Sequence, residues 1–295
     1  MNLPNKVEII EVGPRDGIQN ESTFISTENK IELINALNKT GIKRMEATSF
    51  VHPKYVPQMK DAKEVLEGID RDPSIQYMAL IPNEKGCDRA IESGIKALSL
   101  VVGASDSFNL KNVKMTREQS IQSFETVIKK AKEQDIFIRY SIATSFWCPF
   151  EGKVDSDLVL DLVEKAENLG VDEIVLCDTI GRANPAQVFD LFEKVMSLQT
   201  TAMITAHFHD TYGMALSNVV AALQTGVTRF DASIGGLGGC PFAPGAAGNS
   251  STEDIVFMLH EMGIETGIDL KQLLACVEMV KPLTNRNLTG HLHKV

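Results

Sequence analysis

Eight short apolar runs, rich in β-branched residues, recur at fairly even intervals along the chain. They are nearly continuous in apolar residues instead of alternating with polar ones, which is typical of parallel strands that are buried on both faces. We therefore predict eight parallel strands. Their ranges are 7–12, 44–50, 77–81, 97–102, 137–143, 173–177, 203–208 and 229–234.

Helical patterns occupy the segments between these runs, with apolar residues recurring on one face. Thr116 and Gln119 have the spacing of a capping box, and Asn184 followed by Pro185 is typical of an N-cap and a first-turn proline. Both sites predict the start of a helix. Further helices are predicted at 28–39, 158–169, 216–224, 251–262 and 269–280.

Eight strands that alternate with helices predict an α/β fold of the (β/α)₈ TIM-barrel class, which typically needs about 250 residues. The chain has 295 residues and no linker or low-complexity tract. We expect one catalytic domain over residues 1–295, with one or two extra helices in a C-terminal extension at 250–295. A doubly wound open sheet is the alternative, but the first strand leads into Gly13-Pro14-Arg15-Asp16-Gly17, which lacks the GxGxxG spacing.

Composition narrows the classes of function. A net charge of −10 argues against a nucleic-acid-binding protein, because it leaves no broad basic face. Five irregularly spaced cysteines without a CxxC pair argue against a disulfide framework or a structural zinc site, and favour a reducing, cytoplasmic location. The start of the chain is not a signal peptide, and no apolar run approaches the length of a membrane span, so we expect no membrane partner.

Polar residues gather at the carboxyl ends of the predicted strands, where TIM barrels carry their chemistry. Arg15 and Asp16 follow the first strand, and they offer a guanidinium and a hard oxygen ligand or, alternatively, only a surface ion pair. Glu46 lies inside the second strand, where it must either neutralise an arginine or serve the site. Asp178 ends the sixth strand, and it either takes part in the chemistry or caps the next helix.

The seventh strand ends in His207-Phe208-His209. Side chains two positions apart on a strand share a face, so both imidazoles can point into the barrel mouth and bind a divalent ion. Asp16 can add a carboxylate and Asn249 an amide oxygen to the same ion. Two nitrogen and two oxygen ligands suit Mg²⁺ or Mn²⁺, with Zn²⁺, Co²⁺ and Fe²⁺ left open.

Cys240 lies in a loop rich in glycine and proline, from 233 to 249, after the eighth strand. Such a loop holds a thiol in the open, where it can act as a nucleophile or a proton donor. No third residue completes a Cys–His triad, which favours the proton donor. The other four cysteines are predicted to be buried and inert. They are Cys87, Cys148, Cys177 and Cys276.

Three segments together strongly resemble the 3-hydroxy-3-methylglutaryl-CoA lyase family. They are Glu11-Val12-Gly13-Pro14-Arg15-Asp16-Gly17-Ile18-Gln19-Asn20-Glu21, His207-Phe208-His209-Asp210-Thr211-Tyr212-Gly213 and 235–249. The similarity covers nearly the whole chain in order, and the cysteine loop is specific to the lyases. A wider group of metal-dependent barrel enzymes shares versions of the first two segments.

The resemblance implies a lyase that cleaves hydroxymethylglutaryl-CoA to acetyl-CoA and acetoacetate, a reaction of leucine degradation and ketone-body formation. It suggests Asp16, His207, His209 and Asn249 as ligands of Mg²⁺ or Mn²⁺, Arg15 and Gln19 as substrate-binding residues, Cys240 as the catalytic thiol, and Glu46, Asp178 and Glu253 as supporting acids. It also implies an acyl-CoA partner and a homodimer. Phe208 stands where a cysteine is often seen, and its side chain is expected to point away from the site.

The expected chemistry is a retro-Claisen cleavage. A base removes the proton of the tertiary hydroxyl, and Asp16, His207 and Asp178 are the candidates. Arg15 stabilises the charge on the thioester oxygen, and Cys240 protonates the enolate carbon. The alternatives are a Claisen-type condensing enzyme of the isopropylmalate or homocitrate synthase kind, a lyase for a related 3-hydroxyacyl-CoA, a metal-dependent hydrolase and a non-catalytic scaffold.

Overall fold

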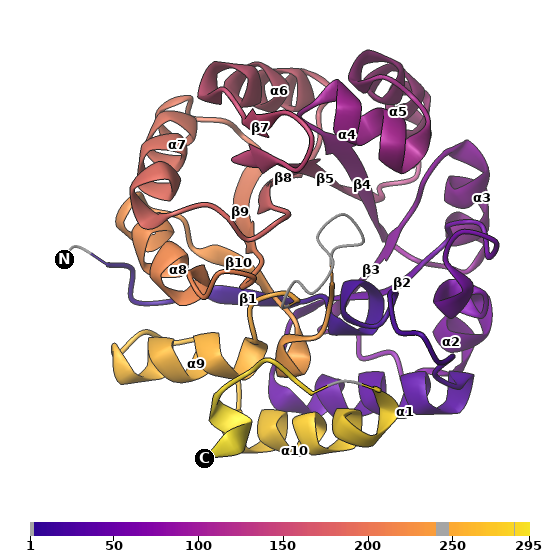
Figure 1. The fold of residues 1–295 in the computed structure, drawn as a ribbon. Coiled ribbons are helices and arrows are strands. Elements are labelled where there is room, and N and C mark those ends of the chain that lie inside the picture. Colours follow the sequence, from indigo (N-terminus) through magenta and orange to yellow (C-terminus); the bar gives the residue numbers. More distant parts are fainter. Residues whose placement is uncertain (1–2, 240–247, 286) are drawn as a thin grey trace.

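The protein is represented by a computed structural model that describes residues 3–239, 248–285 and 287–295. Eight parallel strands close into a barrel in the order β1-β10-β9-β8-β5-β4-β3-β2 (Figure 1). This confirms the predicted TIM barrel. The barrel strands are β1 (Glu8–Glu11), β2 (Arg44–Ser49), β3 (Gln76–Leu80), β4 (Ala97–Gly103), β5 (Phe137–Ala143), β8 (Glu173–Asp178), β9 (Met203–Phe208) and β10 (Arg229–Ala232).

Each predicted strand lies where the apolar runs placed it, with ends that differ by at most two residues. The predicted capping box at Thr116 is present, and Asn184 is the N-cap of α7 with Pro185 in its first turn, as predicted. The helices are α1 (Thr27–Leu37), α2 (Ala62–Gly68), α3 (Glu84–Glu92), α4 (Asp106–Val113), α5 (Arg117–Lys132), α6 (Ser156–Asn168), α7 (Pro185–Ser197), α8 (Ala215–Gln224), α9 (Thr252–Glu261) and α10 (Leu270–Val280). A small hairpin of β6 (Trp147–Cys148) and β7 (Gly152–Lys153) follows β5.

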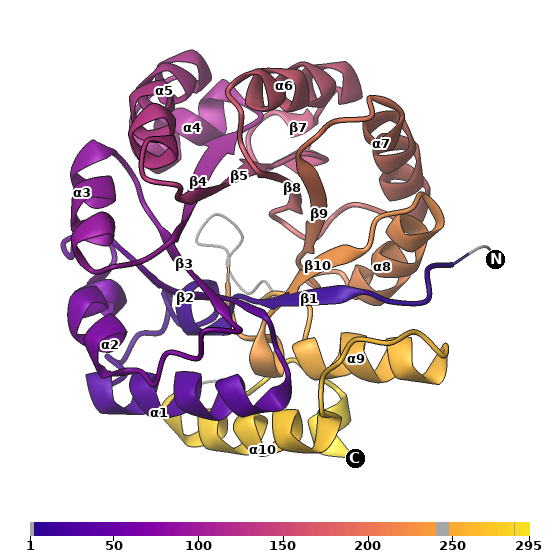
Figure 2. The ribbon, with the colours of Figure 1, turned by 180° about the vertical axis from the view of Figure 1, so that it is seen from behind.

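The helices form a ring around the barrel, and the view from behind shows the same ring closed by α1, α9 and α8 (Figure 2). The main apolar core lies between the strands and these helices. Helix α9 follows β10 and takes the place of the eighth barrel helix. Helix α10 lies outside the ring against α1, so it is the one extra C-terminal helix. None of the helices among the described residues has the length and apolar character that crossing a membrane requires.

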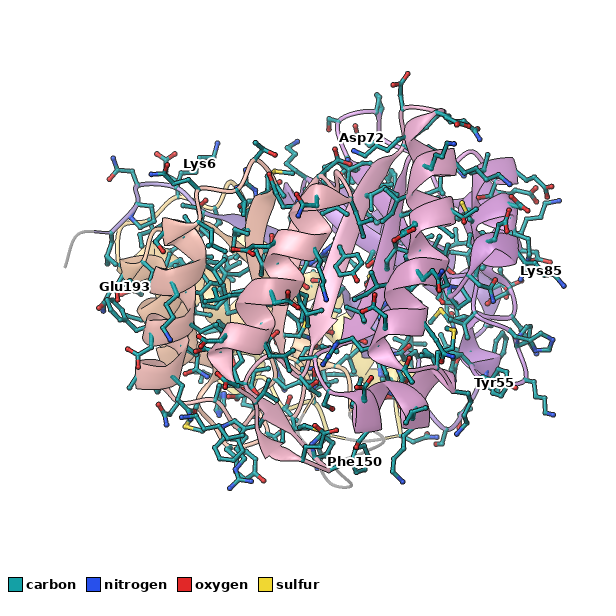
Figure 3. All side chains as sticks on the ribbon, turned by 90° about the horizontal axis from the view of Figure 1, so that it is seen from above. Lys6, Tyr55, Asp72, Lys85, Phe150 and Glu193 are labelled. Carbon is teal, nitrogen blue, oxygen red and sulfur yellow. The ribbon has the colours of Figure 1, made fainter. Side chains whose placement is uncertain are left out.

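The barrel interior carries charged side chains instead of only the bulky aliphatic residues that are usual in this fold. Alternate residues of the strands point inward. The inward set includes Arg44, which pairs with Glu173, and Arg139, which pairs with Asp231. All four are at most 6% exposed. Tyr55 and Phe150 mark the face at the carboxyl ends of the strands, which is opposite the face marked by Lys6 and Asp72 (Figure 3).

Candidate metal centre and active site

Asp16, His207 and His209 form one cluster at the carboxyl ends of β1 and β9. Each offers one ligand atom, and these atoms all lie within 4.8 Å of one another. His207 is the fifth residue of β9, and His209 directly follows the strand, so the spacing of two puts both rings on the inner face. The ring centroids are 5.1 Å apart. The side chain of Phe208 points the other way and packs on Phe146, as expected.

Asn249 reaches this cluster from the end of the glycine-rich loop. Its Nδ2 donates to Asp16 Oδ2 at 2.8 Å and to Leu237 O at 2.9 Å. Its buried Oδ1 has no hydrogen-bond partner in the described part of the chain. The side chain is therefore held by its nitrogen, and its oxygen is left to act as a ligand.

Glycine is required where the loop passes Asn249. A Cβ on Gly238, whose φ is +132°, would lie 2.4 Å from Asn249 Nδ2. A Cβ on Gly248 would lie 2.6 Å from two backbone oxygens. The glycines that mark this loop in the sequence thus bring the backbone close to the side chain of Asn249, a candidate metal ligand.

Arg15 and Asp16 lie in a single π-helical turn, η1 (Gly13–Gly17), directly after β1. Arg15 Nε donates to Glu46 Oε2 at 2.6 Å, and Arg15 Nη1 donates to Asp16 Oδ1 at 2.6 Å. Glu46 therefore neutralises Arg15, which is one of the two roles predicted for it. Gln19 Nε2 also donates to Asp16 Oδ1, at 2.7 Å.

Electrostatics keep the cluster ready to bind a cation. Burial alone would raise the pKa of Asp16, but Arg15 and the two imidazoles outweigh it and lower this pKa to about 2. Burial and the neighbouring His207 lower the pKa of His209 to about 4. At neutral pH the carboxylate is ionised and the His209 imidazole is neutral, which are the forms that bind metals.

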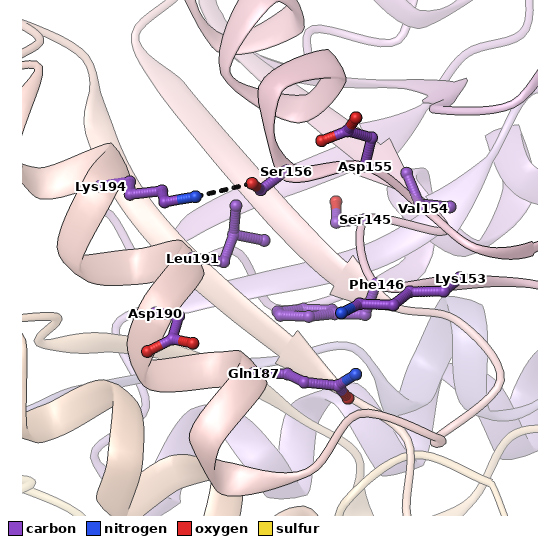
Figure 4. A pocket seen from close by; sticks show the side chains of 10 residues that line it. All are labelled: Ser145, Phe146, Lys153, Val154, Asp155, Ser156, Gln187, Asp190, Leu191 and Lys194. Atoms are coloured by element: carbon purple, nitrogen blue, oxygen red, sulfur yellow. Dashed lines mark hydrogen bonds between the residues drawn. The ribbon is translucent and has the colours of Figure 1, made fainter.

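A cavity of about 450 Å³ opens in front of this cluster. The predicted site residues that line it are Arg15, Asp16, Gln19, Glu46, His207 and His209. Apolar side chains such as Val56 and Phe108 also line it. A second cavity of about 400 Å³ lies between α6 and α7, and it holds no predicted site residue (Figure 4).

Asp178 and Glu253 do not line the cavity. The Asp178 carboxylate accepts hydrogen bonds from the backbone of Arg182 and Ala183 at 3.0 and 2.9 Å, so it caps the turn that precedes α7. Burial raises its pKa to about 6. Glu253 lies in the first turn of α9 and accepts a hydrogen bond from Gly235 N at 3.0 Å. Burial raises its pKa to about 7.

Cys240 lies outside the described residues, and its role stays a prediction. Gly239, the residue before it, lines the cavity, and its carbonyl oxygen accepts a hydrogen bond from Asn20 Nδ2 at 2.9 Å. The other four cysteines are free and buried, as predicted. Cys177 nevertheless lines the cavity, where burial strongly raises the pKa of its thiol.

The sequence analysis missed two charged residues beside the histidines, Arg139 on β5 and Asp231 on β10. Arg139 lies at the cavity, and Asp231 Oδ2 lies 2.9 Å from His207 Nδ1. The signal was available in the sequence, because each is a charged residue inside an apolar strand, as Glu46 is. The sequence did not show which charges would meet across the barrel.

Comparison with known proteins identifies the family. The sequence model described as HMGL-like matches residues 6–280. The chain belongs to this family. The predicted resemblance and the predicted fold are both confirmed.

Its relatives include proteins named as hydroxymethylglutaryl-CoA lyases. The hydroxymethylglutaryl-CoA lyase of Bacillus subtilis is 45% identical over 293 residues, which cover 98% of each chain. The crystal structure of the Bacillus subtilis HMG-CoA lyase has a TM-score of 0.97 at 44% identity, covering 100% of this chain and 99% of that one. An HMG-CoA lyase from Acinetobacter baumannii, solved in complex with coenzyme A and 3-methylmalate, has a TM-score of 0.94 at 44% identity, covering 99% and 95%.

Proposed function

We propose that this protein is a divalent-metal-dependent carbon–carbon lyase that cleaves 3-hydroxy-3-methylglutaryl-CoA to acetyl-CoA and acetoacetate. The observation that carries the proposal is the meeting of Asp16, His207, His209 and Arg15 at one cavity in a chain of the HMGL-like family. A retro-Claisen cleavage needs a bound metal ion and a cationic side chain such as Arg15 beside it, because negative charge develops at two oxygens of the substrate.

The donor set fits a divalent cation. Two imidazole nitrogens and the Asp16 carboxylate converge, and the buried Asn249 Oδ1, for which the described residues offer no hydrogen-bond donor, supplies a fourth ligand. Mixed nitrogen and oxygen ligands suit Mg²⁺ or Mn²⁺. When bound, such an ion would supply Lewis-acid polarisation and lower the pKa of the substrate's tertiary hydroxyl.

Arg15 stabilises the charge that develops on the thioester. When the carbon–carbon bond breaks, its electron pair passes to the acetyl-CoA fragment, and the thioester oxygen becomes an enolate oxygen. Arg15 is at this cavity, and its guanidinium is oriented in advance by Glu46 and Asp16. A fixed cation that needs no reorganisation during the reaction is the most effective kind of electrostatic stabiliser.

Two proton transfers complete the reaction. A base takes the proton of the tertiary hydroxyl, and the resulting oxygen lone pair forms the ketone of acetoacetate. The cavity position favours Asp16 over Asp178 for this step, because the Asp178 carboxylate binds backbone N–H groups instead. His207 has no free nitrogen for this step when its Nε2 binds the metal, because its Nδ1 contacts Asp231. Cys240 gives a proton to the enolate carbon and yields acetyl-CoA. The position of Gly239 at the cavity supports this role.

The test is incubation of the purified protein with hydroxymethylglutaryl-CoA and either Mg²⁺ or Mn²⁺. We expect equal amounts of acetoacetate and acetyl-CoA, no free CoA thiol, and loss of the products after chelation. Release of CoA thiol without acetoacetate would instead indicate a hydrolase. Thiol release that needs acetyl-CoA and a 2-oxo acid would indicate a condensing enzyme. Parallel assays with shorter and longer 3-hydroxyacyl-CoA esters give the acyl specificity.

Two further predictions accompany this function. The protein is expected to be a homodimer, which light scattering after size-exclusion chromatography tests directly. It is expected to act in the cytoplasm, which fractionation of the source cells tests.

A further inference from the structure

Three buried residues from three strands form a line that ends at a metal-ligand histidine. Asp231 on β10 and His207 on β9 are Cα partners in the parallel register, so their side chains lie side by side on the inner face. Arg139 reaches them from β5. Arg139 is 1% exposed, Asp231 5% and His207 8%, so all three are largely buried where they border the cavity.

Each oxygen of the Asp231 carboxylate has its own partner. Oδ1 accepts a hydrogen bond from Arg139 Nη2 at 2.5 Å, and Oδ2 lies 2.9 Å from His207 Nδ1. The Arg139 guanidinium is always cationic, and the ion pair that it forms with this buried carboxylate holds Asp231 in its ionised form. An ionised carboxylate can only accept hydrogen bonds. The proton between Asp231 and His207 therefore belongs to Nδ1 of the histidine.

We propose that Asp231, held by Arg139, is a positioning residue that fixes His207 as the tautomer with hydrogen on Nδ1 and leaves the Nε2 lone pair free to bind a cation. The inference rests on the metal site of the proposed function. It follows the general pattern in which the second nitrogen of a metal-binding imidazole donates to a carboxylate. The two histidines differ in this respect, because the buried Nδ1 of His209 meets no hydrogen-bond partner in the residues that the structure describes.

The arrangement predicts the effect of Asp231→Asn. Arg139 Nη2 can only donate, so the amide must turn its oxygen to Arg139 and its NH₂ group to His207. The NH₂ group then donates to Nδ1, and the hydrogen of the neutral imidazole is forced onto Nε2, where it blocks the lone pair. An isosteric change therefore inverts the tautomer. We expect the affinity for Mn²⁺ to fall about 10- to 100-fold, the usual loss when such a partner of a metal ligand is changed.

The experiment uses the full chain without substrate. Long-range proton–nitrogen correlation spectra of protein labelled at histidine report the tautomer, and His207→Gln assigns the His207 signals by their disappearance. The metal-free wild type should show hydrogen on Nδ1, and Asp231→Asn should show it on Nε2. Calorimetric titration with Mn²⁺ measures the affinity. Asp61→Asn is the matched control, because Asp61 is also a buried aspartate (7% exposed) paired with a cation, Lys30, at 2.7 Å. It should bind Mn²⁺ as the wild type does.

Hydrogen on Nε2 in the wild type would overturn the proposal, whether or not Asp231→Asn folds. Wild-type Mn²⁺ affinity in a folded Asp231→Asn would also overturn it. These outcomes are separable from failure of the proposed function. If the wild type has the expected tautomer and binds Mn²⁺ but does not cleave hydroxymethylglutaryl-CoA, the activity is wrong and the inference about His207 stands.

Discussion

Asn249 Nδ2 donates a hydrogen bond to Asp16 Oδ2 at 2.8 Å across 233 positions of sequence. This contact joins the turn after the first strand to the loop after the last one, and it does so at the candidate metal site. Asn249 thus orients one candidate ligand with its nitrogen, and its oxygen is available as another. The contact joins the first and the last of the loops that follow the barrel strands.

Asn249→Ala removes both contributions. We expect the Mn²⁺ affinity to fall at least about 10-fold, because one ligand is lost and Asp16 is no longer held. Calorimetric titration of the substrate-free protein measures this. Asn184→Ala is the control, since that side chain caps α7 and should cost about 1 kcal/mol of stability without changing metal affinity. Equal Mn²⁺ affinities for Asn249→Ala and the wild type would remove Asn249 from the metal site.

His207→Ala and His209→Ala should each weaken the binding of Mn²⁺ by at least about 10-fold, because each removes a nitrogen ligand from the same cluster. His260→Ala provides the comparison, as His260 contacts Thr266 away from the cavity. Unchanged titration curves for both variants of the cluster would contradict the assignment of the site.

Arg15→Lys should not behave as a conservative change. Lysine keeps the charge but lacks the planar guanidinium, which donates to Glu46 and to Asp16 at the same time. We expect kcat/KM for hydroxymethylglutaryl-CoA to fall about 100-fold, the usual cost of losing one preorganised donor at a developing oxyanion. The exposed Arg89 gives the matched control Arg89→Lys, which should keep full activity. A wild-type kcat/KM for Arg15→Lys would show that Arg15 has another role.

Cys240→Ala should bind Mn²⁺ and the acyl-CoA ester normally and lose about 10²- to 10⁴-fold in kcat, the usual contribution of a general acid. Steady-state assays measure kcat, and titrations with Mn²⁺ and with the acyl-CoA ester measure binding separately. Cys276→Ala, which changes a buried thiol of α10, should leave kcat unchanged. Near-normal kcat in Cys240→Ala would exclude the thiol from the chemistry.

Glu11 predicts a pH dependence of stability. Its carboxylate accepts hydrogen bonds from Gly13 N, Ile234 N and Thr252 Oγ1, yet burial raises its pKa from 4.5 to about 7. The folded protein therefore binds this proton more tightly than the unfolded chain does. The stabilisation from the protonated form is complete below pH 4.5 and is lost as the pH rises through about 7.

Glu11→Gln removes this titration. The free energy of unfolding of the wild type, relative to that of Glu11→Gln, should fall by up to about 3 kcal/mol between pH 4.5 and pH 8. Urea unfolding of both proteins at several pH values measures the difference, in which the other titrating groups cancel. A difference that rises with pH would mean that the three hydrogen bonds to the carboxylate outweigh its burial.

The sequence by itself determined the barrel and most of the candidate metal-binding cluster. Continuous apolar runs specify strands buried on both faces, and their alternation with amphipathic helices leaves few topologies. A spacing of two put His207 and His209 on one face of one strand, and position after a strand put Asp16 at the same rim. These relationships depend only on the geometry of a strand and on the rule that the carboxyl ends of all the barrel strands lie on one face.

Only the tertiary structure decided which charges meet across the barrel. Arg139 and Asp231 are 92 positions apart, and their contact depends on the register and closure of the sheet. For the same reason the sequence left two roles open for Glu46 and for Asp178, and the fold pairs the first with Arg15 and uses the second to cap a turn. A buried charge must find a partner, but the partner is fixed by how the strands close on one another and not by any pattern along the chain.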